Sequence, residues 1–264
     1  MGKFFLSILI IFISVGGLVA QLKMELLLDT VIKADEVYLD PLNQIYLINN
    51  TDKSISKYNS HFQLLKRISF NQGWDHAVMD VSDPFKCILY YPGDYKILIL
   101  DESLSVIASY DESELNVQSV ICHYTTDYIG IFSNNVLKLK NYEQQKSLSS
   151  EPLYQSETSH TEYPYQLKQS NEYIYLLKPG FGISRFTNQL FEESSWKMPD
   201  IIKKMDVTGE RLFYFSNAYL ITFDTKLKME EIILKEVDQF KSFAVNSQYL
   251  LILLENQLRL FKWK

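Results

Sequence analysis

The stretch Val78–Asp101, VMDVSDPFKCILYYPGDYKILILD, decides the fold. It contains three short runs rich in aliphatic, β-branched and aromatic residues, separated by the turn-forming pairs Asp83-Pro84 and Pro92-Gly93. Proline fixes φ and aspartate bonds nearby backbone groups, so both pairs favour tight turns. The stretch therefore predicts three antiparallel strands, and VIASYD at residues 106–111 predicts a fourth.

Similar units recur along almost the whole chain. Asp40-Pro41-Leu42 and Asp83-Pro84-Phe85 hold the same place in the first two units and are the strongest sign of a repeat. The predicted central strands are centred near Tyr46, Leu89, Gly130, Tyr175, Phe213 and Leu251. A spacing of about 40 residues is typical of four-stranded propeller blades. The sequence thus predicts an all-β, six-bladed β-propeller, since radial closure leaves only short strand edges.

Two other architectures are weaker interpretations. The polar stretch Glu143–Glu162 reads as a surface insertion with at most one strand, and a seven-bladed ring would need it to contain more. A β-sandwich fits poorly because the hairpins are too numerous and too evenly spaced.

The two ends of the chain complement each other. The sixth unit, Phe240–Trp263, is one strand short, and the apolar run Leu22–Leu28 is a spare strand at the other end. Placed on the outside of the sixth blade beside Gln257–Trp263, it would close the ring and cover an open strand edge.

Residues 1–20 have the features of a secretory signal peptide. Met1-Gly2-Lys3 is a short basic start, Phe4–Val15 is apolar, and Gly16–Ala20 is rich in small residues. The apolar run is shorter than a membrane-spanning helix needs, and an uncleaved anchor is the alternative interpretation. We expect cleavage after Ala20, which leaves a single domain at residues 21–264.

The net charge of the chain limits the classes of partner that it can be expected to bind. The formal net charge is −6, and loss of Lys3 with the signal would make it −7. Mild acidity disfavours nucleic acid and anionic lipid as main partners. We expect an exported monomer, free in the periplasm or associated with the outer membrane, with no transmembrane segment after cleavage of the signal.

The first units resemble a family of uncharacterised secreted β-propeller proteins from Bacteroidota. The resemblance is clear over residues 36–105 and thin beyond, with Asn43 or Gln44 in place of the family's glycine and Asp83 in place of its asparagine. The matching segments are Asp40-Pro41, Ile45–Ile48, Lys57-Tyr58, Asp80–Ser82, Pro84–Lys86 and Ile99–Asp101. This resemblance implies a propeller fold and a cell-envelope location, and it transfers no functional residue.

Two connections between predicted blades carry the polar residues best suited to a ligand. These are Asn71–Ala77 and Ser159–Pro164, at one mouth of the predicted channel. The candidate residues are Trp74, Asp75, His76, His160, Glu162 and Tyr163. Histidines and carboxylates suit a metal or acid–base chemistry. No ligand spacing ties them together, so ordinary polar loop residues are the simpler interpretation, and no metal, cofactor or catalytic residue is assigned.

Other residues with chemical potential have ordinary explanations. His123 lies in a predicted innermost strand, where a hydrogen-bonded histidine is favoured over one that lines the channel. Cys87 and Cys122 lie in strand interiors, which suits buried thiols as well as a disulfide. Several aromatic residues in or beside predicted turns are open to two interpretations, blade packing or a binding surface. They are Trp74, Tyr90, Tyr91, Tyr95 and Phe181.

Two functions follow from these patterns. The sequence lacks GxSxG, GxGxxG, GxxxxGK, HExxH and CxxC motifs. We therefore expect a non-catalytic binding scaffold whose partner is an exported or outer-membrane protein. The alternative is a metal-dependent enzyme of the lactonase or lyase type, with Asp75, His76, His160 and Glu162 at the channel mouth.

Overall fold

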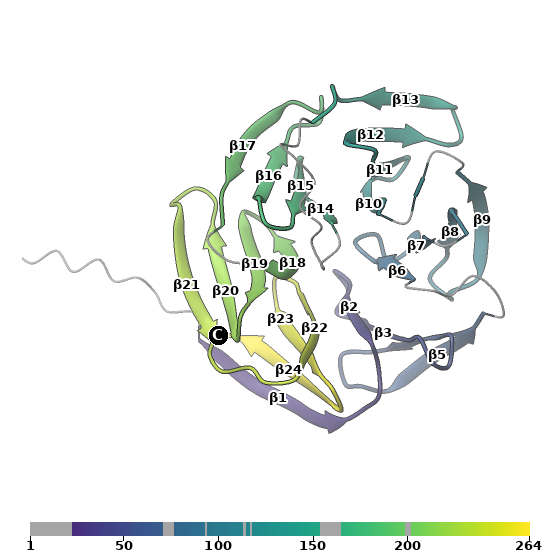
Figure 1. Ribbon diagram of the computed structural model, residues 1–264. Helices are drawn as coiled ribbons and strands as arrows, with labels where there is room; N and C mark the ends of the chain where they lie inside the picture. Colours follow the sequence, from purple (N-terminus) through teal and green to yellow (C-terminus); the bar gives the residue numbers. More distant parts are fainter. Residues whose placement is uncertain are drawn as a thin grey trace, which may run out of the picture.

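A computed structural model describes residues 23–70, 77–92, 94–112, 115–116, 118–153, 165–198 and 202–264. In these ranges 24 strands form six four-stranded antiparallel sheets arranged as the blades of a ring (Figure 1). The protein is a six-bladed β-propeller, as the repeat predicted. None of the described residues forms a helix long and apolar enough to cross a membrane.

The blades follow one another in chain order, and the strands of each run from the centre outward. Blade 1 contains β2 (Glu36–Leu39), β3 (Ile45–Asn49), β4 (Ser54–Tyr58) and β5 (Leu64–Ser69). Blade 2 contains β6 (Val78–Asp80), β7 (Cys87–Tyr91), β8 (Lys96–Leu100) and β9 (Val106–Asp111). Blade 3 contains β10 (Val120–Thr125), β11 (Tyr128–Ser133), β12 (Val136–Asn141) and β13 (Lys146–Ser149).

The second half of the chain repeats this order. Blade 4 contains β14 (Gln166–Ser170), β15 (Tyr173–Lys178), β16 (Gly182–Phe186) and β17 (Glu192–Trp196). Blade 5 contains β18 (Ile202–Thr208), β19 (Arg211–Ser216), β20 (Tyr219–Asp224) and β21 (Met229–Leu234). Blade 6 contains β22 (Phe240–Val245), β23 (Tyr249–Leu254), β24 (Gln257–Trp263) and β1 (Met24–Val31).

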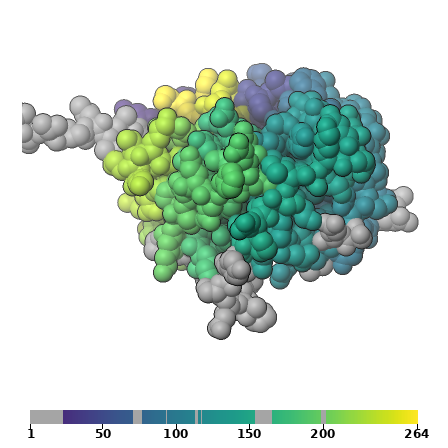
Figure 2. All heavy atoms as spheres, turned by 90° about the horizontal axis from the view of Figure 1, so that it is seen from above, coloured from purple at the N-terminus to yellow at the C-terminus, as the bar shows by residue number. Residues whose placement is uncertain are grey.

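The N-terminal strand closes the ring, as predicted. β1 pairs antiparallel with β24, from Met24 opposite Trp263 to Val31 opposite Gln257. The amide of Lys264 donates to the Lys23 carbonyl at 2.9 Å, which extends the pairing by one residue. Figure 2 shows the yellow C-terminal residues beside purple N-terminal residues at this join. The strand begins two residues later than the expected Leu22 and continues three residues past Leu28.

The core is divided among the junctions between blades. Six clusters of buried side chains lie between neighbouring blades, one cluster at each junction. Alternate residues of each central strand contribute to two different clusters, as Ile45 and Tyr46 of β3 do. Strand periodicity explains this, because successive side chains point to opposite faces of a sheet. The central strands are buried on both faces of their blade, which is why they read as continuous apolar runs.

The two faces of the ring differ in their connections. Turns after the first and third strands of each blade lie at one face, called here the AB face, as residues 40–44 and 59–63 do in blade 1. Connections after the second and fourth strands lie at the opposite face, called here the DA face. The repeated Asp-Pro turns are both AB turns. In blade 1, Asp40 is buried and accepts hydrogen bonds from the Gln44 amide at 2.8 Å and the Tyr46 hydroxyl at 3.0 Å.

Both cysteines are buried free thiols. The Cys87 sulfur lies 3.9 Å from the Tyr46 hydroxyl, at the junction of blades 1 and 2. Cys122 packs with Leu167 at the junction of blades 3 and 4. The alternative of a disulfide is therefore wrong, because the two side chains face different junctions.

Removal of the closing strand tests the join directly. We expect deletion of Met24–Val31 to lower Tm by roughly 10 °C or more, since about 1 kcal/mol shifts Tm by 2–4 °C in a domain of this size. A synthetic peptide of residues 23–35 added in trans should restore much of the loss, because it can re-form the β24 pairing. A scrambled peptide is the control in thermal denaturation. An unchanged Tm after deletion would contradict the closure.

Gly130 provides a test of packing between blades 3 and 4. A Cβ at this position would lie 2.9 Å from the Cys122 sulfur and 3.6 Å from Leu167. We expect Gly130→Ala to destabilise the protein by about 1–3 kcal/mol in urea unfolding through overpacking. In a Cys122→Ala background the same change should cost less, because the sulfur is gone. Strictly additive effects would show that the two positions do not compete for space.

Candidate functional site

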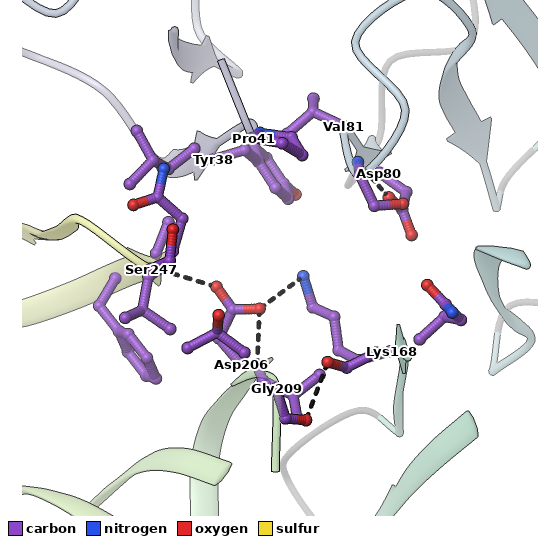
Figure 3. A pocket seen from close by; sticks show the side chains of 18 of the residues that line it. Tyr38, Pro41, Asp80, Val81, Lys168, Asp206, Gly209 and Ser247 are labelled. Atoms are coloured by element: carbon purple, nitrogen blue, oxygen red, sulfur yellow. Dashed lines mark hydrogen bonds and ion pairs between the residues drawn. The ribbon is translucent and has the colours of Figure 1, made fainter. Parts of the chain in front are cut away.

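A polar cavity lies at the centre of the ring, near the AB face. Its volume is about 330 Å³, and Figure 3 shows side chains converging on it from several blades. Blades 1, 2, 4, 5 and 6 line it with the later residues of their innermost strands and with the AB turns that follow. Pro41, Ser82, Asn171, Gly209 and Ser247 are the turn residues that define its mouth.

One row of side chains supplies the chemistry of this cavity. These residues sit at matching positions of the six innermost strands, opposite Tyr46, Ile88, Gly130, Tyr175, Phe213 and Leu251 of the second strands. The row consists of Tyr38, Asp80, Cys122, Lys168, Asp206 and Ala244, and all of these except Cys122 line the cavity. Burial raises the pKa values of Tyr38 and Cys122 well above their usual range, so both stay neutral. The row therefore carries two carboxylates and one ammonium.

Lys168 reaches across from β14 to the next blade. Its ammonium lies 3.4 Å from Asp206 Oδ1, and the two side chains are 23% and 15% exposed. Burial lowers the pKa of Lys168, but the attraction of Asp206 and Asp80 outweighs burial and leaves that pKa raised. Lys168 therefore remains a cation at physiological pH.

Asp206 also holds backbone groups. Its Oδ2 accepts a hydrogen bond from the Val245 amide of blade 6 at 2.9 Å, and its Oδ1 accepts one from the Val207 amide at 3.0 Å. The carboxylate thus joins blades 5 and 6 while it pairs with Lys168 of blade 4. Three blades meet at this one side chain.

Asp80 holds the corresponding place between blades 2 and 3. It is 8% exposed, and its two oxygens accept hydrogen bonds from the Ser82 amide at 2.8 Å and the His123 amide at 3.0 Å. Its side chain faces the cavity in Figure 3. Among the described residues no cationic group lies within ion-pair distance of it, in contrast to Asp206.

The same kind of contact occurs at three further junctions. The Tyr38 hydroxyl accepts from the Met79 amide at 3.2 Å, the Gln166 side chain from the Met205 amide at 2.7 Å, and the Ser242 hydroxyl from the Val37 amide at 3.3 Å. An innermost strand has no neighbour on its inner side, so alternate amides there lack backbone partners. Side chains of the preceding blade supply those partners at five of the six junctions in the described structure.

A second charged cluster lies deeper in the channel, and its positive and negative charges cancel. The Lys204 ammonium contacts both Glu36 and the Ser242 hydroxyl, and Glu36 also accepts from that hydroxyl at 2.7 Å. The ammonium lies 5.2 Å from the centre of the Tyr38 ring. This cluster joins blades 5, 6 and 1 and adds no net charge to the cavity.

The AB turns around the cavity are acidic. Blades 2 to 5 each carry one carboxylate there: Asp83, Asp127, Glu172 and Glu210. Asp83 lies 3.6 Å from His123 Nε2, and Glu210 pairs with Lys226 at 2.6 Å. Asp127 and Glu172 are exposed and form no ion pair with the described residues.

The residues predicted at the channel mouth lie outside the described residues. This holds for Trp74, Asp75, His76, His160, Glu162 and Tyr163. Their roles therefore stay predictions, as does the metal-dependent alternative built on four of them. The described cavity opens toward the AB face, whereas the prediction placed a site where the innermost strands begin. In the described part of the chain no three His, Cys, Asp or Glu side chains form a group able to hold a metal ion.

His123 lies in the innermost strand β10, and its ring does not line the central cavity; its backbone amide donates to Asp80, and its ring Nε2 lies 3.6 Å from Asp83 Oδ2. It is 9% exposed, and its ring faces blade 2 and the Asp83 turn instead of the central cavity. The ring borders a second cavity of about 160 Å³ between blades 2 and 3. The aromatic prediction divides: Tyr90 and Tyr91 are buried in blade packing, so a surface role for them is wrong, whereas Tyr95 is 40% exposed.

Comparison with known proteins supports the fold alone. No protein-family profile and no curated protein sequence matches the chain. Among solved structures, a streptogramin B lyase shares 8% identity at a TM-score of 0.63, covering 92% of this chain and 98% of its own. The WD40 domain of Neurospora crassa Pan2 shares 10% sequence identity at a TM-score of 0.62, and the alignment covers 92% of this chain and 95% of that domain. Virginiamycin B lyase from Staphylococcus aureus shares 9% sequence identity at a TM-score of 0.59, and the alignment covers 91% of this chain and 99% of the lyase.

A sequence signal for the cavity exists and was overlooked. Met79-Asp80-Val81 and Met205-Asp206-Val207 repeat the same three residues in two innermost strands. A carboxylate between two apolar residues in a buried strand requires partners, and here both copies accept an amide from the next blade.

The Lys168 ion pair predicts a pH-dependent stability. We expect Lys168→Gln to lower the free energy of unfolding at pH 7 by about 1 kcal/mol, because Asp206 loses its cation. The folded-state pKa of Lys168 is raised, so its contribution is complete below the unfolded pKa of about 10.4 and is lost as pH rises through the folded value. Urea unfolding of both proteins from pH 7 to 11.5 measures this.

Lys226→Gln is the matched control. Lys226 pairs with Glu210, but its side chain is 71% exposed, so solvent screens the pair. We expect a smaller loss at pH 7 than for Lys168→Gln. A difference between wild type and Lys168→Gln that stays constant or grows above pH 11 would contradict the assignment.

Proposed function

We propose that this protein is a non-catalytic binding scaffold of the bacterial cell envelope and that its partner is an exported or outer-membrane protein. The observation that carries the proposal is the concentration of exposed apolar side chains on the AB face. Monomeric proteins seldom expose many large apolar groups together unless they bind something.

Those side chains come from turns and strand starts of four blades. Nine large apolar residues exposed by more than a third lie at this face: Leu42, Leu64, Leu65, Phe85, Val106, Ile107, Phe191, Leu227 and Met229. Six of them belong to the neighbouring blades 1 and 2. Phe85 is 57% and Ile107 is 54% exposed, which is high for side chains of this size. We call this set the AB apolar surface.

The cavity chemistry supports binding over catalysis. Asp80, Asp206 and Tyr38 each accept a backbone amide of the next blade, so these groups have structural duties that a nucleophile or general base would have to abandon. A rigid ring with a polar central cavity and with exposed apolar side chains on the same face suits recognition, which needs a surface that does not rearrange. The signal-like residues 1–20 support an envelope location for the complex.

A face-specific pull-down tests the proposal. Tagged protein is recovered from cross-linked cell envelopes, and the co-purifying proteins are quantified by mass spectrometry against an untagged control. We expect one dominant stoichiometric partner. The double variant Phe85→Ser/Ile107→Ser should lower its recovery at least about tenfold, because interface energy concentrates in a few apolar anchors.

The control variant changes the opposite face. Val31 is 83% exposed at the end of β1, and Tyr219 is 37% exposed at the start of β20, so Val31→Ser/Tyr219→Ser alters apolar groups of the DA face. We expect it to retain the partner. Exposed substitutions of both kinds should leave Tm nearly unchanged. Equal recovery with both double variants, or no stoichiometric partner at all, would overturn the proposal.

A further inference from the structure

We propose that the central cavity receives a lysine or arginine side chain of the protein partner and that Asp80 is the group that pairs with it. The inference rests on the proposed function in one respect, because it takes the cation to belong to the docked protein. Its basis is the charge balance of the cavity, which is separate from the AB apolar surface.

The row of six matching residues carries an excess negative charge. Asp80 and Asp206 face a single ammonium, that of Lys168, and Lys168 pairs with Asp206 at 3.4 Å. The deeper Lys204 is matched by Glu36, so it does not compensate the second aspartate. One carboxylate therefore remains without a cation among the described residues.

Asp80 is the carboxylate that has no ion pair of its own among the described residues, because Lys168 attracts it only from beyond ion-pair distance, and it is more than nine-tenths buried. Two amide hydrogen bonds fix both oxygens in place, while each oxygen retains a free lone pair that is available to a further donor. Buried charges are ordinarily paired because their desolvation is costly. A guanidinium or ammonium that entered the cavity would supply the missing pair.

The position of Lys168 argues against an anionic ligand in the cavity. Its ammonium is held on the Asp206 side, across the cavity from Asp80 (Figure 3). An anion near Lys168 would be repelled by two fixed carboxylates. The only cation it could bind there, Lys168, already pairs with Asp206. A cation beside Asp80 would instead be attracted by both carboxylates and repelled only by Lys168.

The mouth of the cavity favours the same charge. Glu172, next to the mouth residue Asn171, is exposed and carries no ion pair with the described residues, so it attracts cations toward the opening. The cavity of about 330 Å³ falls at the lower end of ligand-site volumes. It suits one long side chain better than a folded segment. Leu42 and Phe85 of the AB apolar surface lie in the turns that follow the innermost strands β2 and β6, where they would contact the residues that flank that side chain.

Blocked tripeptides test the charge preference on the purified protein. The probe is acetyl-Gly-Arg-Gly-amide, whose only charge is the guanidinium. Matched controls replace arginine by citrulline, which is neutral and nearly the same shape, and by glutamate. In titrations followed by NMR, we expect the arginine peptide to bind at least about tenfold more tightly than the citrulline peptide, since a buried charge pair is worth that much or more. The glutamate peptide should not bind.

Two variants give opposite predictions. Asp80→Asn should lower arginine-peptide affinity about tenfold or more, because the pairing charge is lost. Lys168→Gln should raise the affinity by a few-fold, because it removes a repulsive charge. If Asp80→Asn does not fold, Lys168→Gln alone still decides. A loss of affinity in Lys168→Gln, equal binding of arginine and citrulline peptides, or binding of the glutamate peptide would each overturn the proposal.

The outcomes of the two experiments are separable. A failed pull-down with a positive peptide titration would refute the stable protein partner but keep a cation-binding cavity. A face-specific partner with no peptide preference would keep the scaffold and refute the cation site. The peptide measurement needs no knowledge of the partner.

Discussion

The propeller depends on how its innermost strands satisfy amides that have no backbone partner. Each such strand is the inner edge of its sheet, and in water-poor surroundings an unpaired amide costs about 1–3 kcal/mol. Five junctions solve the problem with a side-chain acceptor from the preceding blade, among them Tyr38, Asp80 and Asp206. Three of the five acceptors, Tyr38, Asp80 and Asp206, also line the central cavity, so structure and the proposed recognition share these side chains.

The outer strand edge of blade 6 is satisfied differently, by pairing with the N-terminal strand. Strand β1 covers β24, and contacts at the C-terminus reinforce that join: the Trp263 ring nitrogen donates to the Asn246 carbonyl at 3.1 Å. Leu28 of β1 packs with Leu258 and Leu260 of β24 in the cluster between blades 6 and 1. Ring closure thus couples residues at the two ends of the described chain. A closed ring is rigid, and rigidity makes a fixed cavity and a fixed surrounding surface possible.

The sequence predicted much of the fold, because alternation, turn residues and a repeat of constant length are local signals. The closing strand followed from a missing partner in the last unit. The cavity was not predicted: Lys168 lies in the segment YQLKQ, which carries no motif, and only the ring brings it to Asp206. Tyr90 and Tyr91 were placed beside a turn, yet their burial depends on neighbouring blades. Contacts between blades are distant in sequence, so no local pattern reports them.

Native-state hydrogen exchange tests directly whether side chains of the preceding blade protect the inner edge strands. The amides of Val37, Met79, His123, Met205 and Val245 lie on edge strands and donate to side chains of the preceding blade. We expect them to exchange as slowly as amides of the central strands, which open only with much of the structure. Exchange as fast as that of exposed turn amides would contradict this expectation, and would show that the ring is held by apolar packing between blades alone.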